Sequence, residues 1–264
     1  MSDLITYAVD DHIAHITLNR PEAMNAMNTP MADAIGNALE QAVADDDVRV
    51  IILAGTGRAF CAGADLKEIA AGRTVQPTVK EWGFGGVAQH WISKPLIAAV
   101  NGIAFGGGSE IVLACDLVVA SETATFGLPE VKVGLFAAAG GVVRLQRQIA
   151  IKRALQLALT GDPIHAATAK DWGLVNEVVA PDEVLPRAFE LARRIAANAP
   201  LSVQYSKQLL HQTSSGGSDW NPSWNGVDPW NANDEAMKVI FSSADAVEGS
   251  TAFTQKRAPI WSGK

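Results

Sequence analysis

Two glutamates are the residues of this sequence with the clearest capacity for chemistry. Glu110 comes two residues after the run 106–108, which is all glycine, and it opens an apolar run that begins at Ile111. A buried carboxylate is unfavourable without a partner or a role, so Glu110 is a candidate for catalysis. An outward-pointing glutamate that complements a helix dipole explains it equally well. Glu130 follows Pro129 at an expected helix start or turn, where capping is the more common explanation.

Two backbone segments could offer amide N–H groups to a ligand. The glycines at 106–108 allow close backbone approach and unusual dihedral angles. The stretch 61–69 follows an expected buried strand and opens a short helix. N–H groups at a helix start lack intrahelical acceptors and lie at the positive end of the dipole, so they can stabilise a developing oxyanion. Taken alone, a strand-to-helix turn capped by Asp65 is the better explanation of 61–69.

Several common chemistries are excluded by residue spacing. The glycine run matches neither G-x-G-x-x-G nor G-x-x-x-x-G-K-[ST], the two nucleotide-binding patterns. Ser109 is not in a G-x-S-x-G elbow, because Ile111 takes the last position. A short-chain nicotinamide dehydrogenase needs Tyr-x-x-x-Lys, but the residues four after the two tyrosines are Asp11 and Leu209. The five histidines are scattered without metal-ligand spacing, so no metal site is expected.

The elements expected in the first two-thirds of the chain alternate between strands and helices. Apolar spacing predicts strands at 5–9, 13–18, 48–53, 96–100 and 117–120, and helices at about 29–42 and 109–115. This order favours a mostly parallel α/β fold. Thr29 is expected to cap the first helix, with Pro30 in its first turn. The later pattern is mainly helical, with helices at 149–159, 165–172, 183–197 and 202–211 and one strand at 174–179.

Composition limits the class of protein. Of the 264 residues, 48% are hydrophobic and 19% are charged, which supports a sizeable core and excludes extensive disorder. The net charge of -7 argues against nucleic-acid binding, so an anionic ligand must be held by local groups. The acidic, alternating start of the sequence is not expected to be a signal peptide, and no apolar run is long enough to predict a membrane span. With only two cysteines, no disulfide framework is expected, and the protein is predicted to be soluble and cytoplasmic.

Taken together and in this order, the segments 61–69, 101–110 and 125–134 resemble the enoyl-CoA hydratase (crotonase) superfamily. The resemblance covers nearly the whole chain, and further matching stretches are Asn19-Arg20-Pro21, 139–145, 246–249 and 252–257. It implies a crotonase-type spiral of ββα units over residues 1–200 and a C-terminal helical trimerisation region over residues 201–264. It also implies a homo-oligomer, either a trimer or a dimer of trimers.

The resemblance implies a role for individual residues. The backbone N–H groups of Ala64 and Gly107 match the family's oxyanion hole, and Glu110 and Glu130 match the two catalytic glutamates of hydratases. Keeping both acids favours the addition or removal of water across the double bond of an acyl-CoA thioester. No cofactor is implied beyond the CoA of the substrate itself. The residues implied to bind the substrate are Ala23, Met24, Ala62, Asp65, Leu66, Lys67, Gly106, Phe253 and Lys256.

Several alternatives stay open. The stretch 72–91 and the tail from Ser243 resemble carnitinyl-CoA dehydratases, which makes that activity the alternative function. A Trp/Asn-rich insertion at about 214–233 could be a lid over the acyl end, a subunit contact or a mobile loop. Lys256 and Arg257 could form a solvated helix end that complements the dipole. Other functions to be weighed are an isomerase or thioester hydrolase with the same oxyanion hole, and a non-enzymatic subunit with a relic site.

Overall fold

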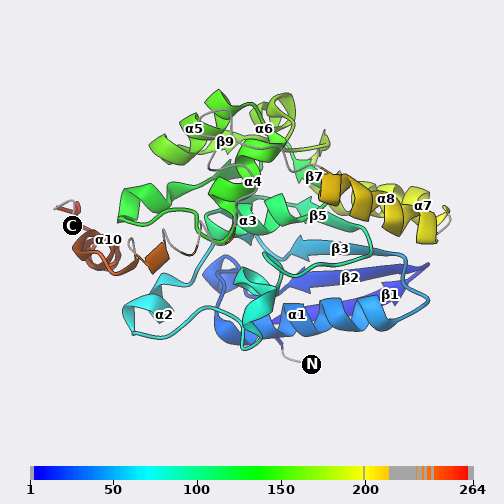
Figure 1. Ribbon diagram of the computed structural model, residues 1–264, viewed down its shortest axis with the longest axis horizontal. Helices are drawn as coiled ribbons and strands as arrows, with labels where there is room; N and C mark the ends of the chain where they lie inside the picture. Colours follow the sequence, from blue (N-terminus) through cyan, green and yellow to red (C-terminus); the bar gives the residue numbers. More distant parts are fainter. Residues whose placement is uncertain are drawn as a thin grey trace.

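The computed structural model describes residues 3–198, 200–213, 230, 234, 237–238 and 241–260, and its strands form two sheets (Figure 1). The larger sheet has six strands in the order β1-β2-β3-β5-β7-β10. β1 is antiparallel to β2, and every other neighbouring pair in this sheet is parallel. Its strands are β1 (Ile5–Asp10), β2 (Ile13–Leu18), β3 (Val50–Gly55), β5 (Leu96–Val100), β7 (Leu117–Ser121) and β10 (Glu177–Val179).

The smaller sheet is made of short strands and alternates along the chain with the larger one. Its strands, in spatial order, are β4 (Ala59–Cys61), β6 (Ile103–Phe105), β8 (Thr125–Gly127) and β9 (Ile164–His165). The chain passes from β3 to β4, from β5 to β6 and from β7 to β8, giving one strand to each sheet every time. The three pairs continue into α2 (Leu66–Ala70), α3 (Gly107–Ala114) and the 3-10 turn η4 (Pro129–Val133). This repetition confirms the predicted α/β class with ββα units.

Apolar side chains cover both faces of the larger sheet, as the alternation of side chains along a strand requires. On one face, Ile51 and Leu53 of β3 pack in the core that includes α1 (Thr29–Ala44). On the other face, Val50 and Ile52 pack with α7 (Val184–Ala196). Figure 1 shows α1 and α7 on opposite sides of the strands. The sheet is thereby packed between two helices, and the loops at its end can place functional groups.

The cap of α1 differs from the prediction. Asn28 caps the helix, because its side-chain oxygen accepts a hydrogen bond from the N–H of Met31 at 3.1 Å. The predicted Thr29 cap is wrong because the Thr29 hydroxyl donates instead to the carbonyl oxygens of Thr74 and Gln76. The predicted Pro30 lies in the first turn, as expected. The threonine therefore ties the helix start to the segment that follows α2.

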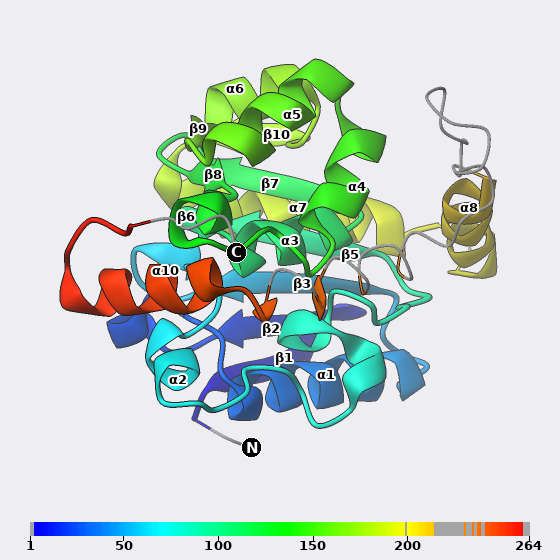
Figure 2. The ribbon, with the colours of Figure 1, turned by 60° about the vertical axis from the view of Figure 1, so that its left-hand side comes forward.

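The second half of the chain is mainly helical, and its last helix returns to the spiral. Helix α10 (Ala244–Gln255) packs on both η4 and α2, and Figure 2 shows it running beside α2. A Cβ atom on Gly249 would lie 1.7 Å from the carbonyl oxygen of Val133, so only glycine allows this approach. The remaining elements are α4 (Gly141–Gln148), α5 (Ile151–Thr160), α6 (Ala166–Trp172), α8 (Pro200–Thr213), η1 (Pro21–Ala23), η2 (Lys80–Trp82), η3 (Phe84–Gly86) and η5 (Pro181–Glu183).

Two further predictions concern the C-terminal part. The Trp/Asn-rich insertion at about 214–233 lies outside the described residues, apart from Trp230. The division of the chain near residue 200 stays a prediction. In the part of the chain that the structure describes, no helix is both long enough and apolar enough to cross a bilayer.

Candidate active site

The peptide of Ala64 is oriented by a parallel bridge to Met27. The N–H of Met27 donates to the carbonyl oxygen of Gly63 at 2.7 Å, and the N–H of Asp65 donates to the carbonyl oxygen of Met27 at 2.9 Å. Since both groups that flank Ala64 point toward Met27, the N–H of Ala64 points to the other side of the segment. Within the described ranges this N–H has no backbone acceptor. It is available to a ligand.

Gly107 supplies a second backbone N–H beside that of Ala64. It is the first residue of α3, where N–H groups have no intrahelical acceptor. Gly63 has a φ of +97°, and a Cβ there would lie 3.3 Å from the nitrogen of Gly107 and 2.8 Å from the carbonyl oxygen of Phe105. The backbone before Ala64 and the start of α3 are therefore in direct contact. This contact makes the amides of Ala64 and Gly107 neighbours.

Glu110 and Glu130 converge beside this pair of amides. Glu110 lies one turn into α3 and is 3% exposed, and its Oε1 accepts a hydrogen bond from the N–H of Gly141 at 2.9 Å. Glu130 lies on η4, and its Oε1 is 2.9 Å from the position that a Cβ on Gly106 would take. The Oε2 of Glu130 is buried and has no hydrogen-bond partner among the described residues. A carboxylate oxygen of this kind is suited to a water molecule or substrate atom.

Burial changes the pKa of both glutamates, and the charge of Glu130 also acts on Glu110. Burial raises the pKa of Glu110 to about 8, and the charge of Glu130 adds to this rise, while the N–H groups of Gly141 and Ala139 and the charge of Arg144 oppose it. Burial also raises the pKa of Glu130 to about 7. The pair therefore holds protons near neutral pH, where one carboxyl can accept a proton and the other can donate one.

Most of the residues predicted to contact CoA gather around β4 and α2. The N–H of Ala62 donates to the carbonyl oxygen of Met24 at 3.0 Å, next to Ala23 at the end of η1. Leu66 and Lys67 open α2, and Lys67 is exposed. Phe253 and Lys256 lie exposed at the end of α10, which packs on α2. Their roles toward CoA stay predictions.

The carboxylate of Asp65 is used inside the fold. One of its oxygens accepts the N–H of Lys67 at 3.1 Å and so caps α2, as the strand-to-helix interpretation predicted. The other accepts from the guanidinium of Arg20 at 2.9 Å. Sequence reasoning missed Arg20, Gly63 and Gly141 as members of the site. The motif Asn19-Arg20-Pro21 was the available signal for Arg20, but it carries no indication of what the arginine binds.

One tryptophan of the insertion reaches this neighbourhood. The ring of Trp230 lies 5.2 Å from Cζ of Arg144 in a cation–π arrangement. Arg144 is on α4, one turn after the Gly141 that binds Glu110, and its Nη1 occupies the place that a Cβ on Gly140 would take. Trp230 therefore contacts the helix whose Gly141 binds Glu110.

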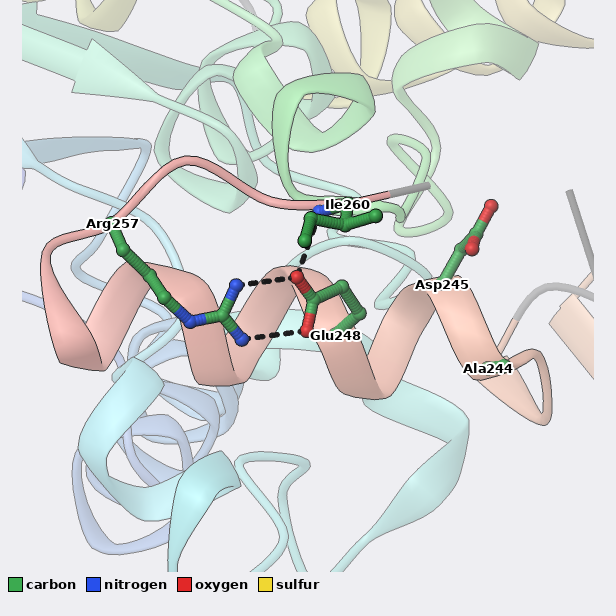
Figure 3. Close-up of a pocket in the computed structure, with 5 residues that line it drawn as sticks. All are labelled: Ala244, Asp245, Glu248, Arg257 and Ile260. Atoms are coloured by element: carbon green, nitrogen blue, oxygen red, sulfur yellow. Dashed lines mark hydrogen bonds and ion pairs between the residues drawn. The ribbon is translucent and has the colours of Figure 1, made fainter. Parts of the chain in front are cut away.

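An open groove of about 400 Å³ lies away from these groups, along α10. Figure 3 shows Arg257 folded back onto Glu248, with the N–H of Ile260 on the same carboxylate. The hydrogen bonds from Arg257 and Ile260 lower the pKa of Glu248 to about 2. Ala244 and Asp245 complete the lining. None of the residues predicted for catalysis lines this groove, and its ion pair is satisfied within α10 and the tail.

Comparison with known proteins agrees with this arrangement. A family model described as enoyl-CoA hydratase/isomerase matches residues 9–264. The chain belongs to the enoyl-CoA hydratase/isomerase family. It is 41% identical over 254 residues to mevalonyl-coenzyme A hydratase from Aspergillus fumigatus, over 95% of this chain and 91% of the relative. It is 37% identical over 267 residues to carnitinyl-CoA dehydratase from Salmonella typhi, over 100% of both chains.

Solved structures of family members show the same fold. The crystal structure of carnitinyl-CoA hydratase from Mycobacterium avium covers 100% of both chains, with 45% sequence identity and a TM-score of 0.91. The predicted resemblance to the crotonase superfamily, with features of the carnitinyl-CoA dehydratase branch, is confirmed. The roles of the single residues in this family member are not tested by these likenesses, and they stay predictions.

Proposed function

We propose that this protein is a hydro-lyase that reversibly adds water across the double bond of a 2-enoyl-CoA thioester. One observation carries the proposal: buried Glu110 and half-buried Glu130, whose Oε2 is itself buried, converge beside the neighbouring amides of Ala64 and Gly107. Family membership supports it, because the matching relatives named above are hydratases and a dehydratase of CoA thioesters.

The geometry supports a simple course of reaction. The thioester oxygen accepts hydrogen bonds from Ala64 and Gly107, and water lies between Glu110 and Glu130. One carboxylate takes a proton as the water oxygen bonds to Cβ and the π electrons move toward the thioester oxygen. The other carboxyl then gives a proton to Cα as the carbonyl re-forms. An oxyanion donor contributes about 2.7–4 kcal/mol, and general acid–base help contributes roughly 10²–10⁴-fold.

The pair of acids favours hydration over the alternatives. Isomerisation of a double bond needs one base, whereas water addition uses an acceptor and a donor. We propose no cofactor beyond the CoA of the substrate, because acid, base and oxyanion donors together complete the reaction. A carnitinyl-CoA dehydratase-like activity is the second candidate, and the likeness to enzymes of that name favours it.

The setting of the enzyme is also part of the proposal. We propose a homotrimer or dimer of trimers, which the exposed apolar side chains Leu201, Tyr205 and Leu210 of α8 support. Two buried free thiols, Cys61 and Cys115, support a reducing compartment such as the cytoplasm. Turnover of 2-enoyl-CoA thioesters would place the enzyme in fatty acid metabolism.

A panel of purified CoA thioesters tests the function. The panel contains crotonyl-CoA, longer and branched 2-enoyl-CoAs and crotonobetainyl-CoA, and hydration is followed as loss of the absorbance of the conjugated thioester. We expect at least one member to be hydrated. A 3-enoyl-CoA is assayed beside the panel, and a gain of this absorbance would indicate an isomerase, whereas release of free thiol from any thioester would indicate a hydrolase. Turnover of crotonobetainyl-CoA alone would establish the second candidate.

A further inference from the structure

Arg20 connects the two chain segments that fix the peptide of Ala64. Its Nη1 donates to the carbonyl oxygen of Ala26 at 2.7 Å, and its Nη2 donates to Oδ2 of Asp65 at 2.9 Å. Ala26 immediately precedes Met27, Asp65 immediately follows Ala64, and Met27 and Ala64 form the bridge described above. One planar guanidinium therefore holds both sides of that bridge at once.

Asn25 reinforces the same connection. It is fully buried and adopts a left-handed backbone conformation, with a φ of +54°. Its Oδ1 accepts the backbone N–H of Arg20 at 2.8 Å, and its Nδ2 donates to the carbonyl oxygens of Thr56 and Ala59 at 2.9 and 2.8 Å. Because Ala59 begins β4, the loop is tied to the strand that leads to Ala64. These hydrogen bonds fix the path of the chain from Arg20 to Met27. Arg20 itself is held at both its backbone N–H and its side chain.

We propose that Arg20 is a positioning residue of the oxyanion hole, which fixes the direction of the Ala64 N–H without touching the substrate. The inference rests on the proposed function. The guanidinium suits the task because two coplanar N–H donors reach a carbonyl and a carboxylate together, and a lysine ammonium lacks this fork. The side chains of Arg20 and Asp65 are only 17% and 10% exposed, so solvent screens their pairing little.

Arg20→Lys tests the proposal, because it keeps a positive charge near Asp65 and removes the fork. We expect kcat for hydration to fall about tenfold to a hundredfold while KM changes less, since a displaced oxyanion donor weakens the transition state more than substrate binding. The second readout is the absorption of a bound 2-enoyl-CoA with an extended conjugated acyl group. Hydrogen bonds to its carbonyl shift the absorption to longer wavelength, and we expect a smaller shift in the variant.

Glu22→Gln is the matched control. Glu22 is another carboxylate near Arg20, with 3.9 Å between Oε1 and Nε, but its side chain is 73% exposed. This variant is expected to keep the wild-type kcat and absorption shift. Asp65→Asn carries the test if Arg20→Lys does not fold, because the amide oxygen can still cap α2 while the charge pairing is lost. Its kcat is expected to fall below the wild-type value with a smaller absorption shift, and a wild-type kcat and shift in this folded variant would overturn the positioning role.

The outcomes separate this inference from the proposed function. If Arg20 only stabilises the fold, the variants melt at lower temperature, yet kcat per folded molecule and the absorption shift stay at wild-type values. That result overturns the positioning role alone. If the wild-type enzyme hydrates no 2-enoyl-CoA and shifts no absorption, the proposed function fails, and the inference fails with it.

Discussion

The two halves of the candidate site are built from different materials. The amide half is backbone: Ala64 and Gly107 offer N–H groups, and the segments around them are held by paired hydrogen bonds. The carboxyl half consists of two side chains, and burial leaves Oε2 of Glu130 without a partner among the described residues. The N–H groups of the amide half remain hydrogen-bond donors at every pH at which the protein is folded. The second half changes its charge near neutral pH, because burial raises the pKa of both glutamates.

This difference determines how each half can be removed. A carboxyl group is lost by exchanging one side chain for another of the same size. An amide N–H survives every substitution except proline, so it can only be displaced, through the glycines and hydrogen bonds that set the path of the chain. Substitutions in the two halves should therefore have different effects. A substitution in the carboxyl half should remove proton transfer and leave the fold intact. A substitution near the amide half should weaken polarisation of the thioester carbonyl and also disturb the fold.

Replacing a carboxyl should have the largest effect on turnover. Glu110→Gln and Glu130→Gln are each expected to lower kcat by roughly 10²–10⁴-fold, because a neutral amide cannot exchange the proton. Binding of the CoA thioester should change little, since glutamine at 110 still offers an oxygen to the N–H of Gly141. Steady-state kinetics and calorimetric titration with a saturated acyl-CoA measure the two quantities. Exposed Glu122 provides the control, as Glu122→Gln, and full activity in either site variant would remove that residue from the mechanism.

Displacing an amide should have the next largest effect. Gly63→Ala adds a Cβ that would lie 2.8 Å from the carbonyl oxygen of Phe105, at a φ of +97°, so the peptide of Ala64 must shift. We expect kcat to fall by about 10²–10³-fold, as for loss of one oxyanion donor. Gly72→Ala is the matched control, because Gly72 also has a positive φ, of +71°, but nothing lies within 4 Å of its Cβ position.

The control separates strain from displacement. Gly72→Ala should cost roughly 1–2 kcal/mol of stability, as a left-handed conformation does for a residue with a Cβ, and leave kcat unchanged. Urea unfolding and kinetics on both variants give the comparison. Equal loss of kcat in Gly63→Ala and Gly72→Ala would show that the amide half does not depend on the local path at Gly63.

The same contrast explains what could be read from the sequence. The long strands and the helices 29–44 and 184–196 were predictable, because their apolar spacing repeats over many residues. β4, β6 and β8 have three residues each, and Ile103–Phe105 lies inside a glycine-rich stretch that reads as a loop. Strands this short are specified by their neighbours in space, through pairing between segments far apart in the chain.

The site was predictable only in part, for a related reason. Composition and spacing singled out Glu110 and Glu130 separately, but nothing local indicates that residues 20 positions apart share one space. The family resemblance indicated that Glu110 and Glu130 act together. The fold brings them together because α3 and η4 follow strands that are neighbours in the smaller sheet. Arg20 was not recognisable as a support, because its partners, Ala26 and Asp65, meet only through the bridge between Met27 and Ala64.

The smallest expected effect concerns stability, and it again distinguishes the halves. A carboxyl whose pKa is raised from 4.5 to about 8 in the folded state keeps its proton at pH values where the unfolded chain has lost it. The native state then binds more protons than the unfolded state, so the free energy of unfolding falls as pH rises between these values. The contribution of Glu110 is fully present below pH 4.5 and is lost by about pH 8.

Glu110→Gln should therefore flatten the pH dependence of stability. Between pH 5 and pH 8.5, urea unfolding of the wild-type protein should lose more free energy than unfolding of the variant, by roughly a few kcal/mol at most. The free energy of unfolding of Glu110→Gln should rise relative to that of the wild type as pH rises. Gly63→Ala should instead change the free energy of unfolding by the same amount at every pH, because no titrating group is removed. Parallel curves for Glu110→Gln and the wild type would show that Glu110 titrates alike in the folded and unfolded chains. The raised pKa, and with it the proton held near neutrality, would then have to be abandoned.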